Sequence, residues 1–173
     1  MAQSAFPATR EISERFFTAE ELETWVPLAA LLELLPRELD LQLIRDDDLT
    51  HFDYFVLSML TNSPEHRLAM TPLAAMTNAT LPRLSRVVTK LDERGLTRRI
   101  PSQEDARVTV VEITPAGRRK VLAATPGHVA NVRSLVLDAL SPEQAVALRG
   151  IAAAILARVD PEGRTAAARP QKV

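Results

Sequence analysis

A chain of 173 residues is long enough for one domain with a sizeable core, and few aromatic residues (4%) with abundant Ala and Leu favour helices. The absence of cysteine excludes disulfides, thiolate metal sites and a cysteine-based redox switch. No segment approaches the roughly 20 apolar residues of a spanning helix, and no signal-peptide-like run is found at the amino terminus, so we expect a cytoplasmic protein.

The net charge is only −1, but the charges are distributed unevenly along the chain. Residues 1–49 hold eleven acidic and four basic residues, whereas residues 81–120 hold ten basic and five acidic residues. A local basic region can attract phosphates even when the protein as a whole is nearly neutral. Nucleic acid is therefore a candidate partner of the central region.

The amino-terminal region predicts one long helix after an irregular segment. Residues 1–17 show no clear period and are expected to form a loose arm or a short helix. Thr18 and Glu21 form a capping box, and a broad apolar stripe follows it. Pro36 is expected to end or kink this helix, because proline lacks the N–H that the helix needs.

Two shorter helices are predicted next. Thr50, with Asp53 at the third position, caps the first of them, and residues 62–64 end it. Thr71 is expected to cap the second, because Pro72 would then occupy the first helical position. Their spacing from the helix that follows is typical of a helix-turn-helix.

The most regular pattern in the chain predicts a helix between Thr80 and Gly95. Thr80 can cap its start, and Gly95 can end it in the left-handed conformation that glycine favours. Its apolar residues recur at the spacing of one helix face, namely Leu84, Val87, Val88 and Leu91. The opposite face carries hydroxyls and cations without a carboxylate, namely Pro82, Arg83, Ser85, Arg86, Thr89 and Lys90.

A two-stranded ribbon is predicted directly after this helix. Residues 96–100 and 107–113 read as strands, and the polar residues 102–106 join them. A helix followed by a basic ribbon is the outline of a winged helix, whose helix fits the major groove while the ribbon reaches a neighbouring minor groove. Double-stranded DNA is therefore the expected partner.

The carboxy-terminal region predicts two further helices and a tail. Thr114 starts the first helix, which Pro126 and Gly127 are expected to interrupt. Ser141, followed by Pro142, starts the last helix. Residues 161–173 are rich in Ala, Arg and Pro and are predicted to form a flexible tail.

The expected fold is mainly α, a winged helix-turn-helix over residues 50–117 within a single domain spanning 1–173. The helices of residues 18–48 and 118–160 are more apolar than a small winged-helix core can use. We therefore expect both chain ends to build a helical dimerisation region with a second copy. A two-fold dimer presents two copies of the helix between Thr80 and Gly95, here called the reading helix, to DNA half-sites about one turn (roughly 34 Å) apart.

The chain resembles the MarR family of winged helix-turn-helix transcriptional regulators over the whole run from Leu73 to Gly117. The residues that carry the resemblance are Leu73, Ala74, Thr80, Ser85 to Val88, Leu91 to Leu96, Arg99, Asp105 to Arg107 and Ile113 to Gly117. The resemblance implies a homodimeric repressor that binds palindromic DNA. It also implies that Arg107 reaches a minor groove and that Asp105 orients the wing. Many relatives release DNA when a small aromatic compound binds between the dimerisation helices and the winged helix.

The candidate DNA contacts are Thr71, Thr80, Leu81, Pro82, Arg83, Ser85, Arg86, Thr89, Lys90, Arg98 and Arg107. Arg83, near the amino end of its helix, is the best candidate for reading guanine, whereas Arg86 and Lys90 are expected to meet phosphate. The alternative is that these cations form an ordinary solvated helix face. Arg107 could likewise only close the wing turn by pairing with Asp105.

Two neighbouring arginines on the first ribbon strand, Arg98 and Arg99, face opposite ways because side chains alternate along a strand. One of them is expected to meet phosphate, and the other to pack against an acid such as Asp92 or Glu93.

Four residues, Trp25, His51, Phe52 and Phe55, are candidates for a pocket that takes a small aromatic effector. The alternative is that the aromatic rings belong to the core and that His51 lies at the surface. No metal, cofactor or catalytic motif is found, so an enzyme is not expected. Two functions remain: a DNA-binding repressor, and a winged-helix protein-interaction module that does not bind DNA.

Overall fold

The computed structural model describes residues 16–102, 105 and 107–168. The predicted arm therefore lies outside the described residues except for its last two positions. Contacts divide the chain into two compact units, Met1–Glu38 and Leu39–Val173. The elements in chain order are α2 (Ala19–Asp47), α3 (His51–Asn62), the 3-10 turn η1 (Pro64–His66), β1 (Arg67–Ala69), α4 (Met70–Met76), α5 (Leu81–Glu93), β2 (Thr97–Pro101), β3 (Thr109–Ile113), α6 (Pro115–Val132), the π-helical turn η2 (Arg133–Leu137), α7 (Pro142–Val159) and η3 (Ala166–Ala168).

Helix α2 begins as predicted and runs without an end at Pro36. The Thr18 hydroxyl accepts a hydrogen bond from the Glu21 N–H at 3.2 Å, and the Glu21 carboxylate accepts one from the Thr18 N–H at 2.7 Å. The helix then continues through Pro27 and Pro36 to Asp47, so of the two outcomes predicted at Pro36, an end or a kink, the end is contradicted. Each proline removes one backbone hydrogen bond, and the helical turns on both sides persist.

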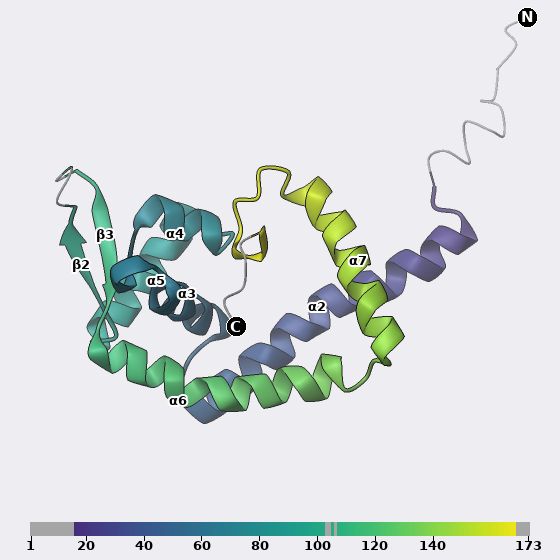
Figure 1. The fold of residues 1–173 in the computed structure, drawn as a ribbon, viewed down its shortest axis with the longest axis horizontal. Coiled ribbons are helices and arrows are strands. Elements are labelled where there is room, and N and C mark those ends of the chain that lie inside the picture. Colours follow the sequence, from purple (N-terminus) through teal and green to yellow (C-terminus); the bar gives the residue numbers. More distant parts are fainter. Residues whose placement is uncertain (1–15, 103–104, 106, 169–173) are drawn as a thin grey trace, which may run out of the picture. The chain divides into compact units, whose positions relative to one another are not determined.

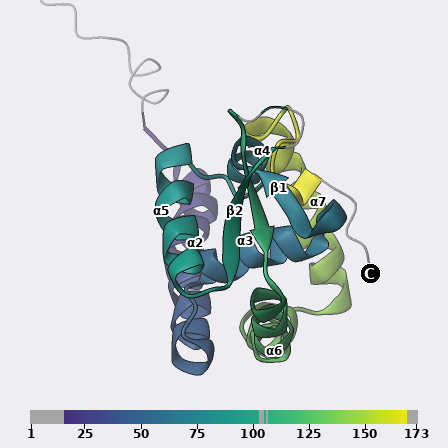
Figure 2. The same ribbon diagram turned by 90° about the vertical axis from the view of Figure 1, so that its left-hand side faces the viewer.

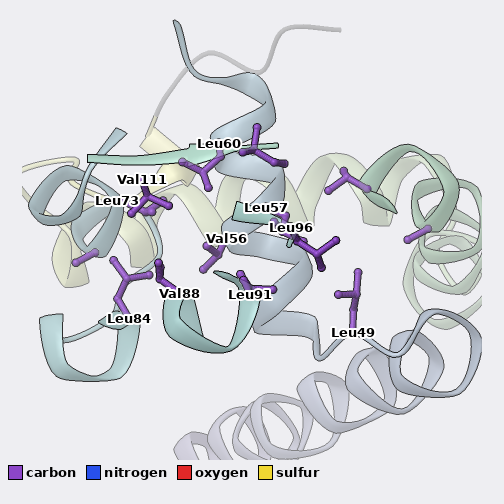
Figure 3. Close-up of a cluster of buried hydrophobic side chains, with 14 of the residues drawn as sticks. Leu49, Val56, Leu57, Leu60, Leu73, Leu84, Val88, Leu91, Leu96 and Val111 are labelled. Carbon is purple, nitrogen blue, oxygen red and sulfur yellow. The ribbon is translucent and has the colours of Figure 1, made fainter. Parts of the chain in front are cut away.

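The core of the second unit is built around α3, whose Val56, Leu57 and Leu60 are fully buried. Figure 3 shows these side chains among apolar residues of α4, α5 and β3. The predicted apolar face of α5 supplies its part of the core, because Leu84, Val88 and Leu91 are all fully buried; Val87 packs at the edge. Burying one such side chain stabilises the fold by about 1.5–3 kcal/mol.

The wing, defined here as residues 97–113, belongs to a three-stranded antiparallel sheet in the order β1-β3-β2. β2 and β3 are the two predicted strands, and Figures 1 and 2 show them beside α5. β1 was not predicted; its three residues pair with β3, with Leu68 opposite Val111. A strand this short has too few residues to show an alternating pattern.

The turn of the helix-turn-helix is placed by caps at α4 and α5. The predicted cap at Thr71 is wrong: α4 starts two residues earlier than predicted, and Ala69 occupies its cap position without a side-chain hydrogen bond. Thr80 caps α5 as predicted, since its hydroxyl accepts a hydrogen bond from the Arg83 N–H at 3.4 Å. Gly95 follows the helix with a φ of 69°, the left-handed conformation expected there.

The carboxy-terminal helices keep the predicted starts, but one predicted break is absent. α6 continues through Pro126 and Gly127 to Val132 and passes directly into η2, so the predicted interruption is wrong. Ser141 forms a capping box with Gln144 at the start of α7, as expected. Among the described residues, no helix has both the length and the apolar character needed to cross a membrane.

The segment after α7 differs from the predicted flexible tail over residues 161–168. The Asp160 carboxylate accepts hydrogen bonds from the N–H groups of Arg164 and Thr165, both at 2.9 Å, and from the Thr165 hydroxyl at 2.7 Å. Ala166 is buried in the turn that follows. A local loop closed by one carboxylate explains why these residues are folded; residues 169–173 lie outside the described residues.

Candidate nucleic-acid interface

The exposed face of α5 carries all the contact candidates that the sequence assigned to this helix. Leu84, Val88 and Leu91 turn into the core, so the polar side chains turn outward. The exposed candidates are Leu81, Pro82, Arg83, Ser85, Arg86, Thr89 and Lys90. Because α5 packs against α4 and β2 on its other sides, this face is the one that stays open to solvent.

Arg83 lies at the amino-terminal end of this face and stacks on an aromatic ring. Its guanidinium carbon is 4.2 Å from the centroid of the Phe52 ring, which comes from the first turn of α3. Within the described part of the chain, the Arg83 guanidinium has no hydrogen-bond partner. Phe52, which the sequence offered as a pocket or core residue, is half-buried and supports a candidate DNA contact.

Lys90, one helix turn from the end of α5, is paired with a buried acid. Its Nζ donates to Asp53 Oδ2 at 2.9 Å, and the Asp53 side chain is only 2% exposed. The same oxygen accepts the Thr50 N–H at 3.0 Å, so the carboxylate also closes the capping box of α3. Lys90 is therefore partly neutralised within the chain, whereas Arg86 makes no ion pair with any described residue.

The two arginines of β2 both pair with acids. Arg99 lies 3.6 Å from Asp92 and donates to the Ser85 carbonyl at 2.8 Å, which ties the wing to α5. Arg98 donates to Glu112, directly opposite on β3, at 2.6 Å. This hydrogen bond lowers the pKa of the Glu112 carboxyl. The prediction that one arginine meets an acid such as Asp92 holds for Arg99, and Arg98 has an acidic partner of its own.

At the tip of the wing, Arg107 and Asp105 form a bidentate ion pair. The Arg107 Nε and Nη2 atoms each lie 3.1 Å from a carboxylate oxygen of Asp105, and the Arg107 N–H donates to the same carboxylate at 3.0 Å. These bonds lower the pKa of Asp105, the side-chain bond more than the backbone bond. Arg107 closes the turn while its side chain stays 91% exposed, so the two alternatives for this residue are compatible.

The candidate hydroxyls differ in what they already bind. Thr71 is exposed in the first turn of α4. Thr80 is occupied as the cap of α5. Thr89 donates to the Ser85 carbonyl at 2.9 Å and accepts from Arg99 at 2.9 Å, so it serves the joint between α5 and the wing.

Of the candidate pocket residues, His51 makes a ring contact with a second histidine. His51 and Tyr54 of α3 lie against His128 of α6, with ring centroids 5.6 Å and 4.6 Å apart respectively. Burial lowers the pKa of both histidines. The nearby Asp40 carboxylate partly offsets this effect at His51, whereas His51 lowers the pKa of His128 further.

The other two pocket candidates, Trp25 and Phe55, belong to α2 and α3 respectively. Trp25 lines an open hollow of about 590 Å³ within the first unit, together with Phe17, Thr24 and Leu28. Phe55 is half-buried on α3.

Three site residues were missed by sequence reasoning: Phe52 and Asp53 as supports of the α5 cations, and Glu112 as the partner of Arg98. The capping box of α3 marked Asp53 as structural, but nothing local marks its second role, because Lys90 is 37 positions away. Cross-strand pairing could have been anticipated for Glu112 once the strand register was known.

Comparisons with known proteins agree on one family. The family model described as the MarR family matches residues 49–109. A crystal structure of Sco3205, a MarR family transcriptional regulator from Streptomyces coelicolor in complex with DNA, is 36% identical with a TM-score of 0.81, and the match covers 84% of this chain and 95% of that chain. AbsC, a MarR family transcriptional regulator from the same organism, is 29% identical with a TM-score of 0.79, covering 83% and 97%.

A curated relative is matched over a shorter stretch. The HTH-type transcriptional repressor YetL of Bacillus subtilis (strain 168) is 29% identical over 89 residues, which are 51% of this chain. The match spans 53% of that repressor's length, or about half of it.

Proposed function

We propose, on the premise that this chain belongs to the MarR family, that it represses transcription by binding double-stranded DNA in a sequence-specific manner. The chain is a transcription regulator and not an enzyme. The observation that carries the proposal is the exposed face of α5, where Arg83 and Arg86 stand beside a ribbon with Arg107 at its tip. The DNA-bound relative at 36% identity supports the same reading.

The proposed contacts divide by chemistry. Arg83 reads a base edge in the major groove, because its guanidinium N–H groups are unpaired and arginine can bind guanine through two of them. Arg86, which has no ion pair with a described residue, meets phosphate. Arg107 enters the minor groove, held in place by Asp105. Lys90 contributes less than the sequence suggests, because Asp53 already holds its charge.

The salt dependence of DNA binding tests this division. We expect Arg86→Ala to reduce the slope of log K against log salt by about one, because one phosphate contact is lost. Lys90→Ala should change the slope less, since the Lys90 ammonium is paired with Asp53 in the free protein. Fluorescence anisotropy with the DNA upstream of the protein's own gene, over a range of salt concentrations, measures both.

The same salt-dependence measurement includes a control variant and tests the alternative function. Arg149→Ala, at an exposed position of α7 outside the proposed DNA contacts, should leave the slope unchanged. Equal slopes for the Arg86 and Lys90 variants would contradict the proposed division. If the unaltered protein bound neither this DNA nor any duplex selected from a random library, the protein-interaction module would be the better description.

A homodimer is part of the proposal, and α7 supports it. None of its 18 residues is buried, although much of the helix is apolar. Val146, Ile151 and Val159 are 59%, 57% and 68% exposed. Apolar area of this extent is typical of a protein interface, and a second copy is the occupant that gives two reading helices.

Sedimentation equilibrium tests the dimer. We expect the unaltered chain to sediment at twice its 19.1 kDa mass, and Ile151→Glu with Ile155→Glu to shift it toward the monomer, because buried unpaired charges oppose association. The matched control is Arg149→Gln together with Arg158→Gln, which lowers the net charge by the same amount as the two isoleucine substitutions but keeps the apolar residues of the same helix. A monomer in the unaltered chain at micromolar concentration would contradict the proposal.

Release by a small aromatic ligand, which the family resemblance implies, stays a prediction. Two of its candidate residues have other contacts: the Phe52 ring lies under Arg83, and His51 lies against His128.

A further inference from the structure

The first turn of α3 contacts two cations on the exposed face of α5. The Phe52 ring lies under Arg83, and the neighbouring Asp53 binds Lys90. Arg83 and Lys90 are seven positions apart, two turns of a helix, so both stand on the side of α5 that faces α3. The first turn of α3 therefore contacts α5 through two of its exposed cations.

We propose that Phe52 is a positioning residue that determines base specificity by holding the Arg83 guanidinium in the orientation that reads a base. The inference rests on the proposed function, because it assigns a role within DNA recognition. Phe52 itself touches no base; it acts through Arg83.

The geometry of stacking leaves Arg83 able to bind. A guanidinium is planar, and its five N–H donors lie in that plane, directed outward from the edge. The guanidinium carbon lies over the Phe52 ring, 4.2 Å from its centroid, and no Arg83 side-chain donor has a hydrogen-bond partner among the described residues. Phenylalanine also offers no acceptor that could compete with a base. The donors therefore remain free for the paired contacts that guanine accepts.

The ring is itself held in place. Phe52 stands between Thr50 and Asp53, whose capping box fixes the first turn of α3. The ring is half-buried and packs against the hydrophobic core, while Val56, one turn further along α3, is fully buried. A fixed ring limits the rotamers of a long side chain that would otherwise be free to move.

Arg86 provides a comparison with Arg83, because no aromatic ring of the described residues lies beneath its side chain. It lies on the same exposed face but makes no ion pair or ring contact with any described residue. A side chain without a fixed orientation can follow a phosphate, but it reads a base poorly because base recognition depends on direction. The two arginines differ in their surroundings and hence in their expected roles.

The experiment compares three full-length proteins that carry the same charge: the unaltered chain, Phe52→Leu and Phe52→Tyr. Each is tested against a duplex selected with the unaltered chain and against duplexes altered at one base pair at a time. Leucine keeps apolar volume but has no ring, whereas tyrosine keeps the ring. Salt slopes are measured alongside, and urea unfolding verifies that each variant is folded.

We expect Phe52→Leu to lose discrimination about two- to fivefold, the size of an exposed cation–π contact. The loss should fall at the base pair where Arg83→Ala also loses discrimination, and the salt slope should stay unchanged. Phe52→Tyr should retain discrimination. In the Phe52→Leu/Arg83→Ala double variant, the leucine should add no further loss at that base pair.

Three results would overturn the inference: unchanged discrimination in Phe52→Leu, a loss of equal size at every base pair, or an additive loss in the double variant. If Phe52→Leu fails to fold, Phe52→Met replaces it under the same criteria. These failures differ from failure of the proposed function, in which the unaltered chain itself would select no duplex.

Discussion

Replacing Gly117 by alanine is expected to lower the free energy of unfolding by about 3 kcal/mol, the upper part of the range for overpacking. A Cβ atom at this position would lie 2.1 Å from the Leu96 carbonyl oxygen and 2.7 Å from the Ile113 side chain. The nearest atom is backbone and cannot rotate away. Urea unfolding followed by circular dichroism measures the change.

The cost arises because α6 starts against the beginning of β2. The Thr114 hydroxyl donates to the Gly95 carbonyl at 2.7 Å and accepts the Gly117 N–H at 3.0 Å, and the Thr114 N–H donates to the Leu96 carbonyl at 3.0 Å. Alanine at position 117 would push the start of α6 away from the Leu96 backbone. The displacement would also move β2, whose Arg99 holds the wing to α5.

The matched control is Gly150→Ala in α7. A Cβ atom at Gly150 would meet no atom within 4 Å, and alanine favours a helix over glycine by about 0.5–1 kcal/mol. We therefore expect the same substitution to stabilise at 150 and to destabilise at 117. Similar effects at both positions would show that helix propensity, and not the close approach to Leu96, governs Gly117.

Replacing Asp53 by alanine is expected to lower the free energy of unfolding by about 2–4 kcal/mol, because a cap and a largely buried ion pair are lost together. The 2% exposed carboxylate accepts from the Thr50 N–H and from Lys90. Alanine leaves both donors without their partner, and the partly exposed Lys90 can turn to water, which keeps the cost below that of a fully buried pair. The shift in urea midpoint measures the loss.

Asp53→Asn separates the two roles. Asparagine has nearly the same shape and keeps an oxygen for the Thr50 N–H but carries no charge for Lys90. We expect a smaller loss of stability than with alanine. The asparagine variant should also gain salt dependence in DNA binding, because its Lys90 is released toward phosphate. A loss equal to that of alanine would place the whole effect in the ion pair.

The local features of this chain were readable from its sequence. Thr18, Thr50, Thr80 and Ser141 each cap the helix they were predicted to cap, and Gly95 adopts the left-handed conformation expected of it. The face of α5 that enters the core and the face that stays exposed were both predicted. These features depend on residues within one or two turns of each other, so sequence spacing determines them.

Tertiary structure decided the rest. β1 exists because β3 supplies its hydrogen bonds from more than 40 positions away. α2 and α6 continue through Pro36 and Pro126, although proline predicted an end or a kink at the first position and an interruption at the second. Of the reading-helix cations, Arg83 rests on Phe52 and Lys90 is held by Asp53, which only the packing of α3 against α5 brings about. The sequence alone determined which helix carries the cations, because periodicity is local; the fold determined how each is held, because their partners are distant along the chain.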